Sequence, residues 1–224
     1  MSARSAILFD IDGTLLYARG VGRKAFGHAF LAVYGIPYPD LEGLTFVGAT
    51  DSAVVRAMAQ ACGVPNTPAR EEHFFLRLAC DIDAALSQNK PHVYPGVPEL
   101  TERLNRLGLA LGLVTGNVRA TAWSKLRHAD LDGAFAFGAY GDDHHERTEI
   151  ARIAVRRAPA DASARVLIGD TPLDVQAAKA NGLAAVAVAT GWVSADELAA
   201  AGADLVLTDF SDTDACISKL EPFL

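Results

Sequence analysis

Two aspartates end a short apolar run near the start of the chain. Residues 7–14 read Ile-Leu-Phe-Asp-Ile-Asp-Gly-Thr, so Asp10 and Asp12 lie two positions apart after apolar residues. The run 6–9 predicts a strand buried on both faces, and Gly13 is expected to end it. Open α/β sheets bind their ligands at the carboxyl ends of their strands, so this pair predicts chemistry rather than packing.

A second segment places polar groups after another apolar run. Thr115, Gly116 and Asn117 follow Leu113-Val114 and precede a predicted helix. The Thr115 hydroxyl and the next two backbone N–H groups could bind an oxyanion at the N-terminus of that helix. An ordinary strand-to-helix turn with Asn117 as N-cap is the alternative interpretation.

Two more acidic residues follow a third predicted strand. Asp170 ends the strand, and Asp174 lies in the first turn of the next helix, pointing back toward the same edge of the sheet. Compensation of the helix dipole would explain Asp174 but not Asp170. Together with Asp10 and Asp12 they make four close carboxylates, which repel unless a cation lies among them. An oxygen-only set favours Mg2+, and beside an anion site it is typical of phosphoryl transfer.

A histidine-containing segment precedes the helix expected at 146–157. His144 and His145 are adjacent and flanked by acidic residues, but neighbouring side chains on a turn point in different directions. A solvated loop is therefore expected rather than a metal site. Arg147 opens the next helix and offers a fixed cation.

The remaining pattern predicts the elements that hold these segments. Helical and strand-like runs alternate from residue 99 onward, which is typical of a Rossmann-like α/β fold, a parallel sheet covered by helices on both faces. Helices are expected at 99–107, 119–129, 146–157, 173–180 and 196–201, and strands at 109–114, 134–139, 165–168, 184–189 and 204–207.

An inserted helical unit is expected after the first strand. Between about residues 18 and 85, apolar residues recur at helical spacing and are punctuated by proline and glycine. This pattern predicts a four-helix insert without strands. The expected division is a core domain of residues 1–16 and 95–224 and a helical cap domain of residues 17–94.

Composition excludes several classes of function. The chain has 224 residues and a net charge of -7, and it has no dense basic stretch, so no nucleic acid is expected as a partner. Neither a membrane-spanning run nor a secretory leader is visible, and no membrane partner is expected. The scattered Cys62, Cys80 and Cys216 disfavour disulfides and zinc. A cytoplasmic protein is expected, as a monomer or a homodimer.

The ordered motifs resemble those of the haloacid dehalogenase (HAD) superfamily. They are Asp10-Ile-Asp12-Gly-Thr14, then Thr115-Gly116-Asn117, then a basic residue, then Gly169-Asp170 with Asp174. The resemblance spans the whole chain, including the place of the helical insert. The segments around Tyr94-Pro-Gly96-Val97, Gly191-Trp192 and Ala201–Asp204 are similar to the phosphoglycolate-phosphatase-like branch.

The resemblance implies a role for each strand-end residue. Asp10 would be the nucleophile that becomes an aspartyl phosphate, and Asp12 the general acid and base whose backbone carbonyl also binds Mg2+. Thr115 and the amide of Gly116 would hold the phosphoryl oxygens.

The resemblance also implies a metal set and a cation beside the nucleophile. Asp170 would ligate Mg2+, with Asp174 supporting the ion directly or through water. Many relatives carry a lysine as the cation of the third motif, but here no lysine lies between Lys125 and Lys179. Arg147 is the best positional match, with Lys125 as the alternative, although the planar guanidinium requires different geometry.

The cap is expected to choose the substrate. Arg19, Arg23 and Lys24 lie where the chain enters the cap, although a solvated helix face would also explain them. The turn at 48–51, which contains Thr50, dips toward the site in relatives. The expected phosphate- and substrate-binding set is therefore Gly13, Thr115, Gly116, Asn117, Arg23 and Thr50.

The leading expectation is a Mg2+-dependent phosphohydrolase that acts on a small phosphorylated metabolite, a phosphoglycolate-like phosphomonoester. A β-phosphoglucomutase-like phosphomutase shares the core residues and stays open. A dehalogenase and a phosphonate hydrolase are disfavoured because neither uses Asp12. A non-catalytic phospho-binding module is disfavoured because it needs no cap.

Overall fold

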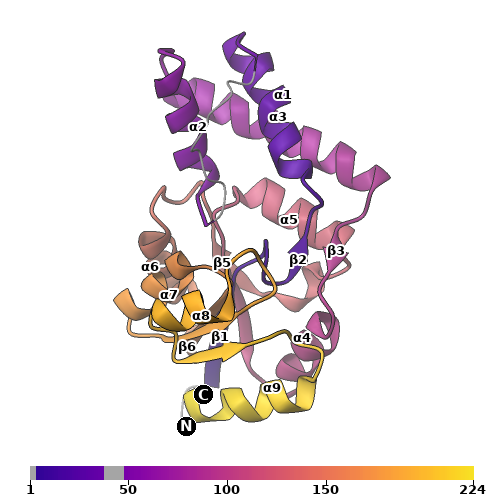
Figure 1. Cartoon of the computed structure of the whole chain (residues 1–224), viewed down its shortest axis with the longest axis vertical. Coiled ribbons are helices and arrows are strands. Elements are labelled where there is room, and N and C mark those ends of the chain that lie inside the picture. Colours follow the sequence, from indigo (N-terminus) through magenta and orange to yellow (C-terminus); the bar gives the residue numbers. More distant parts are fainter. Residues whose placement is uncertain (1–3, 38–47) are drawn as a thin grey trace.

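The computed structural model describes residues 4–37 and 48–224, and its centre is a parallel sheet (Figure 1). The six strands lie in the order β5-β4-β1-β6-β7-β8. Their bounds are β1 Arg4–Phe9, β4 Ala110–Val114, β5 Phe137–Ala139, β6 Ala162–Gly169, β7 Ala184–Val188 and β8 Leu205–Leu207. The first strand of the chain is thus central, which buries both of its faces and explains its uninterrupted apolar sequence.

Helices cover both faces of this sheet, as expected for a Rossmann-like fold. Ile7 and Phe9 of β1 pack on the face covered by α4 (Val97–Arg106), α5 (Arg119–His128) and α9 (Thr213–Leu220). Leu8 points to the other face, which is covered by α6 (Arg147–Arg157), α7 (Pro172–Ala180) and α8 (Ala195–Ala200). Two short 3-10 helices, η1 Asp132–Ala134 and η2 Glu221–Phe223, complete the core.

Most helices and strands lie where the sequence predicts them, with two differences. The strand expected at 134–139 is only Phe137–Ala139, because Asp132–Ala134 forms the 3-10 turn that leads into it. The sequence analysis missed α9, a short helix whose Asp212 side chain accepts a hydrogen bond from the backbone N–H of Ala215.

The insert is helical in the part of the chain that the structure describes. The described residues contain three helices there, α1 Val21–Tyr34, α2 Asp51–Ala61 and α3 Pro68–Gln88, and part of the predicted unit falls on residues outside the description. Phe30, Phe74 and Met58 lie at the centre of its separate apolar core. A cluster of this kind lets the insert pack as a unit beside the sheet.

Two short strands that the sequence analysis did not predict flank the insert. β2 (Leu16–Tyr17) pairs antiparallel with β3 (His92–Val93), so the chain enters and leaves the insert through a two-stranded ribbon. Backbone pairing of this kind satisfies the polar groups of both crossing segments at once, which apolar periodicity alone does not reveal.

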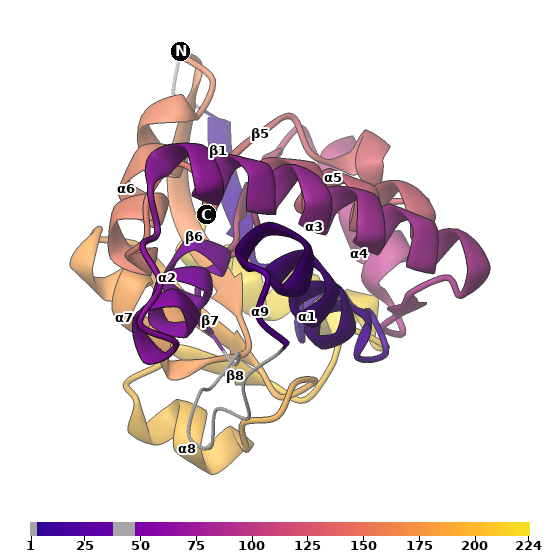
Figure 2. The same cartoon turned by 90° about the horizontal axis from the view of Figure 1, so that it is seen from above.

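The cap helices lie over the core (Figures 1 and 2). Helix α3 packs along α5, and the Ser124 hydroxyl donates to Asp83 Oδ1 at 2.6 Å. Asp83 Oδ1 also lies 3.2 Å from His128 Nε2. Among the described residues, no helix is both long and apolar enough to cross a lipid bilayer.

Candidate active site

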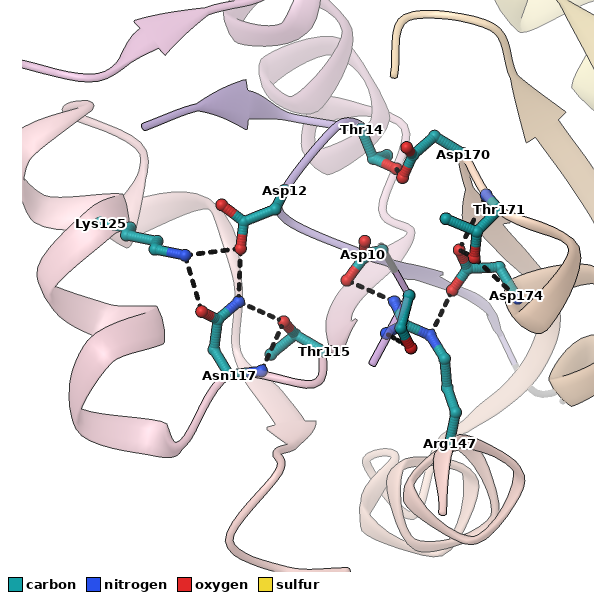
Figure 3. A network of polar contacts seen from close by, with 11 residues as sticks. Asp10, Asp12, Thr14, Thr115, Asn117, Lys125, Arg147, Asp170, Thr171 and Asp174 are labelled. Carbon is teal, nitrogen blue, oxygen red and sulfur yellow. Dashed lines mark hydrogen bonds and ion pairs between the residues drawn. The ribbon is translucent and has the colours of Figure 1, made fainter. Parts of the chain in front are cut away.

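Three neighbouring strands end in the polar residues that the sequence analysis singled out. The parallel register pairs Phe9 of β1 with Leu113 of β4 and with Ile168 of β6. Asp10 follows β1 directly, and its backbone N–H donates to the Ile168 carbonyl. The register therefore brings Asp10 close to the ends of both neighbouring strands, where the close-up in Figure 3 shows their side chains.

A buried arginine joins two of the aspartates. Arg147 Nη2 lies 2.6 Å from Asp10 Oδ1, and Arg147 Nε donates to Asp174 Oδ1 at 2.6 Å. These side chains are almost completely removed from solvent, with exposed fractions of 6%, 6% and 2%. Arg147 is the first residue of α6, so the start of that helix places the guanidinium directly beneath the carboxyl end of β1.

Burial sets the electrostatics of this cluster. It raises the pKa of Asp10 from 3.8 to about 7, with Asp174 and Asp12 adding to the rise and Arg147 opposing it. Burial likewise raises the pKa of Asp170 to about 8, and Asp10 and Asp174 add to that rise. Burial disfavours the Arg147 cation, but the facing carboxylates outweigh it and its pKa is raised. The carboxylates therefore need more positive charge than one guanidinium supplies.

Hydroxyl groups of the protein hold Asp174 and Asp170 in place. Thr171 caps α7 in a capping box, and its backbone N–H and hydroxyl both donate to Asp174 Oδ2. Thr14 donates to Asp170 Oδ1 at 3.2 Å. Gly13 has a φ of +86°, and a Cβ there would lie 2.2 Å from Asp170 Oδ2, so a side chain would collide with the carboxylate.

These carboxylates fit a hard divalent cation. Asp10, Asp170 and Asp174 are buried and offer oxygens within 4.8 Å of one another. When all three are ionised, Arg147 leaves two negative charges, which a divalent cation would balance. Because both Asp174 oxygens already accept protein hydrogen bonds, Asp10 and Asp170 are the better placed ligands.

The Asp12 side chain does not join that acidic cluster, contrary to the expected set of four close carboxylates. Lys125 Nζ lies 2.6 Å from Asp12 Oδ2, and Asn117 Nδ2 donates to the same oxygen at 2.7 Å. Lys125 also donates to Asn117 Oδ1 at 2.7 Å. The carboxylate is drawn to this ammonium, which leaves a metal role only to the Asp12 backbone carbonyl, where it remains a prediction.

The turn after β4 differs from both sequence interpretations. Val118, not Asn117, is the N-cap of α5, so the capping alternative is wrong. The Asn117 backbone N–H donates to Thr115 Oγ1 and is therefore not directed at an anion. Asn117 Nδ2 donates to the same Oγ1, so this oxygen accepts twice and its own hydrogen stays available for a ligand. The anion donors that remain are the Thr115 hydroxyl and the Gly116 amide.

A cavity of about 770 Å³ joins these groups to the cap. Its walls include Asp10, Asp12, Thr115 and Arg147 from the core and Arg23 and Lys24 from α1. Arg19 is not among the lining residues, so the predicted basic cluster reaches the cavity through two of its three members. Gly116 lies at the contact with the cap, since a Cβ there would be 2.4 Å from the Ala49 carbonyl.

The Thr50 hydroxyl is engaged by protein groups in this structure, and its role in substrate binding stays a prediction. Its hydroxyl donates to the His145 carbonyl at 2.8 Å and accepts from the Ala53 backbone N–H as the N-cap of α2. The side chain is buried and does not line the cavity. The hydroxyl therefore donates in a contact between the insert and the core and accepts as the N-cap of α2, so both of its hydrogen-bonding functions are used. The predicted loop histidines, His144 and His145, stack on each other and lie outside the acidic cluster.

Sequence reasoning missed several residues of the cavity wall, among them one acidic and two aromatic side chains. Asp51 accepts a hydrogen bond from the Val118 backbone N–H at 2.8 Å, and burial raises its pKa to about 6. Tyr17 and Trp192 meet edge to face at the cavity, with ring centroids 6.2 Å apart. The only sequence signal for them was position, because Asp51 follows the 48–51 turn and Trp192 follows a predicted strand.

Comparisons with known proteins agree with this geometry. Residues 7–188 match the family described as haloacid dehalogenase-like hydrolase. A phosphoglycolate phosphatase of Mesorhizobium japonicum is 28% identical, with 85% of each chain covered. A 5'-nucleotidase of Pseudomonas aeruginosa is 32% identical, with 87% of this chain and 86% of that protein covered.

A solved structure supports the fold. CbbY of Rhodobacter sphaeroides in complex with phosphate superposes with a TM-score of 0.74 at 23% identity, and the match covers 93% of this chain and 96% of that one. With the family match and the phosphatase relatives, this likeness extends over nearly the whole chain. The chain therefore belongs to the haloacid dehalogenase-like hydrolases and is a phosphatase of that family.

Proposed function

We propose that this phosphatase is a Mg2+-dependent hydrolase of small, anionic phosphomonoesters, phosphoglycolate-like in character, and that it works through an aspartyl phosphate on Asp10. One observation carries the proposal. Two neighbouring aspartates have opposite surroundings, since Asp10 is buried and fixed by Arg147 while the Asp12 side chain is 42% exposed and lines the cavity.

The surroundings of Asp10 suit a nucleophile. Arg147 holds Oδ1, which leaves Oδ2 to attack phosphorus and form the acyl phosphate while the bond to the leaving oxygen breaks. The guanidinium also favours the ionised form, the only form that can attack. Thr115 and the Gly116 amide, at the end of the next strand, are placed to hold phosphoryl oxygens.

The surroundings of Asp12 suit proton transfer. It can donate a proton to the leaving alkoxide and then accept one from the water that attacks the aspartyl phosphate, releasing phosphate and regenerating Asp10. Over the whole cycle, the leaving alcohol gains the proton that Asp12 loses, and the attacking water returns a proton to Asp12.

The metal fits the acidic cluster described above. Asp10 and Asp170 would hold Mg2+, with Asp174 behind them. When bound, the ion would neutralise the carboxylates and the incoming phosphate so that two anions can approach each other.

The leaving group is proposed to be anionic because cations line the cap side of the cavity. Arg23 and Lys24 reach the cavity from α1 of the insert, whereas the acidic cluster belongs to the core. They would attract a carboxylate that enters phosphate-first. A cytoplasmic location remains a prediction.

A turnover profile tests the proposal. Phosphate release is measured across a panel of phosphorylated small acids, sugars and nucleotides, with Mg2+ and with EDTA. We expect turnover that requires Mg2+ and is fastest with short carboxylated esters. A phosphate group that moves within a sugar phosphate, without release, would instead show a phosphomutase.

A further inference from the structure

The site contains a second buried cation that does not touch the nucleophile. The Lys125 side chain is 6% exposed, and its ammonium lies against Asp12 rather than against Asp10 (Figure 3). In the described structure Arg147 makes the ion pair with Asp10 that the third-motif cation was expected to make. Lys125 therefore needs another explanation, since burial of an ammonium group is costly without a specific use.

The contacts of Lys125 form a closed triangle. Its ammonium donates to Asp12 Oδ2 and to Asn117 Oδ1, and Asn117 Nδ2 donates to the same Asp12 oxygen. The three distances lie between 2.6 and 2.7 Å. Two donors thus converge on Oδ2, and the Asn117 amide is fixed in one orientation because its two ends face opposite partners.

This triangle leaves one Asp12 oxygen for chemistry. Figure 3 draws no contact to Oδ1 among the residues shown, and the Asp12 side chain borders the cavity. An anchored Oδ2 fixes the rotation of the carboxyl group and so fixes the direction of Oδ1. Proton transfer depends steeply on such direction, because the donor and the acceptor must be within hydrogen-bonding reach of each other.

We propose that Lys125, acting with Asn117, is a positioning residue that clamps Asp12 Oδ2, so that Oδ1 is the oxygen that exchanges protons with the leaving group and with water. The inference rests on the proposed function for its kinetic consequence, but the clamp itself is independent of turnover. It also separates the two cations, because Arg147 serves the nucleophile and Lys125 serves the proton donor.

Leaving-group chemistry gives a kinetic test. An alkyl phosphate such as 2-phosphoglycolate needs protonation of its leaving oxygen, whereas 4-nitrophenyl phosphate releases 4-nitrophenolate, a stable anion that leaves without protonation. The value of kcat/KM reports steps up to the transfer of phosphate to Asp10. Lys125→Met keeps the apolar stem and removes the ammonium, so we expect kcat/KM to fall about 100-fold for the alkyl ester and less than about 3-fold for the aryl ester.

Two comparisons exclude a general structural effect. Lys90→Met removes a lysine whose ion pair with Asp130 is exposed, and it should leave both kcat/KM values unchanged. Asp12→Asn should show the same split as Lys125→Met. Adding Lys125→Met to Asp12→Asn should cost less than about 3-fold more, because the clamp then has no acid to position.

A measurement without substrate tests the clamp itself. A buried, hydrogen-bonded ammonium exchanges its protons slowly, so 15N NMR of the wild-type protein should show one slowly exchanging lysine Nζ signal. That signal should be lost in Lys125→Met and should broaden or shift in Asp12→Asn. It should be unchanged in Lys90→Met.

The outcomes separate the two proposals. If the wild-type enzyme hydrolyses neither ester, the proposed function fails, and the NMR signal still decides the clamp. If Lys125→Met lowers kcat/KM equally for both esters, Lys125 acts on the phosphate or on the fold and the inference is overturned. The inference would also be overturned if Lys125→Met left kcat/KM for the alkyl ester unchanged. The same holds if the wild-type protein shows no slowly exchanging Nζ signal, or if Asp12→Asn does not change that signal.

Discussion

Each half of the site contains an ion pair between a buried cation and an aspartate, but the two aspartates differ in their exposure to solvent. On one side Arg147 binds Asp10 and Asp174 in a region closed to solvent. On the other side Lys125 is equally buried, but the carboxylate it binds, Asp12, is 42% exposed at the cavity. Each half therefore has a buried cation, and only the carboxylate of the second half is substantially exposed to solvent.

This difference teaches how one short loop could perform the two tasks of the proposed mechanism. A nucleophile must be ionised and immobile, and a guanidinium that holds one of its oxygens favours both. A proton donor and acceptor must instead meet the leaving group and water. Asp10 and Asp12 are only two residues apart, so the difference comes from the helices that supply their partners, α6 for Arg147 and α5 for Lys125.

The largest expected effect comes from the buried half. Asp10→Asn removes the nucleophile with almost no change in shape, so turnover should fall by roughly 10⁴-fold or more. The measurement is phosphate release by protein purified away from host phosphatases, with circular dichroism to confirm the fold. Asp196→Asn, at an exposed helix start, should retain activity. Substantial turnover by the Asp10 variant would refute the aspartyl-phosphate mechanism.

Removal of the metal should have the next largest effect. EDTA should reduce turnover at least about 10³-fold, with Mg2+ restoring it and Ca2+ restoring little, since the larger ion prefers more ligands. Mg2+ should also raise the Tm of the wild-type protein, because it balances the two negative charges left among the buried carboxylates. Asp170→Asn should abolish that rise. Full activity after exhaustive chelation would contradict the proposal.

Replacement of Arg147 should break the buried half without touching the open half. Arg147→Met leaves two buried carboxylates without their cation, so stability should fall by about 3–5 kcal/mol and turnover by roughly 100-fold or more. Denaturant unfolding and steady-state kinetics measure the two effects. Unlike Lys125→Met, this variant should slow alkyl and aryl esters alike. Near-normal activity here, with loss in Lys125→Ala, would reverse the assignment of the two cations.

Asp51 provides a pH test of the open half. Burial raises its pKa to about 6, so its protonated form is favoured in the folded protein, and the stability it contributes is present below pH 4 and lost as pH rises through 6. The Asp51→Asn variant has no carboxyl group to ionise, so it does not lose this stability as the pH rises. The free energy of unfolding of the variant relative to wild type should therefore rise by at most about 3 kcal/mol between pH 4 and pH 8. Parallel pH profiles would show that Asp51 does not titrate in this way.

The smallest effect is expected at the cap side of the cavity. Arg23 is exposed on α1, so Arg23→Ala should raise KM for carboxylated esters by about 3–10-fold and leave KM for a neutral aryl phosphate nearly unchanged. Arg19→Ala is the matched control, because Arg19 does not line the cavity. Equal effects on both substrates would mean that Arg23 does not contact the leaving group.

The sequence by itself determined the strand-end chemistry. Asp10, Thr115 and Asp170 each follow an apolar run that only a buried strand explains, and parallel strands bring their carboxyl ends to one edge. The order of these motifs also established the family, as the match over residues 7–188 confirms. Such signals are local, since each depends on a short apolar run and on the polar residue that follows it.

Only the tertiary structure decided which groups are partners. Lys125 meets Asp12 across 113 residues of sequence, and both Asn117 and Thr50 point to partners that neither helix caps nor motifs reveal. Arg23 and Arg19 differ in the same way, since both are basic but only one reaches the cavity. Contacts of this kind depend on how each helix is rotated against the sheet and on where the cap lies over it. Packing across the whole core sets both, so no short stretch of residues encodes them.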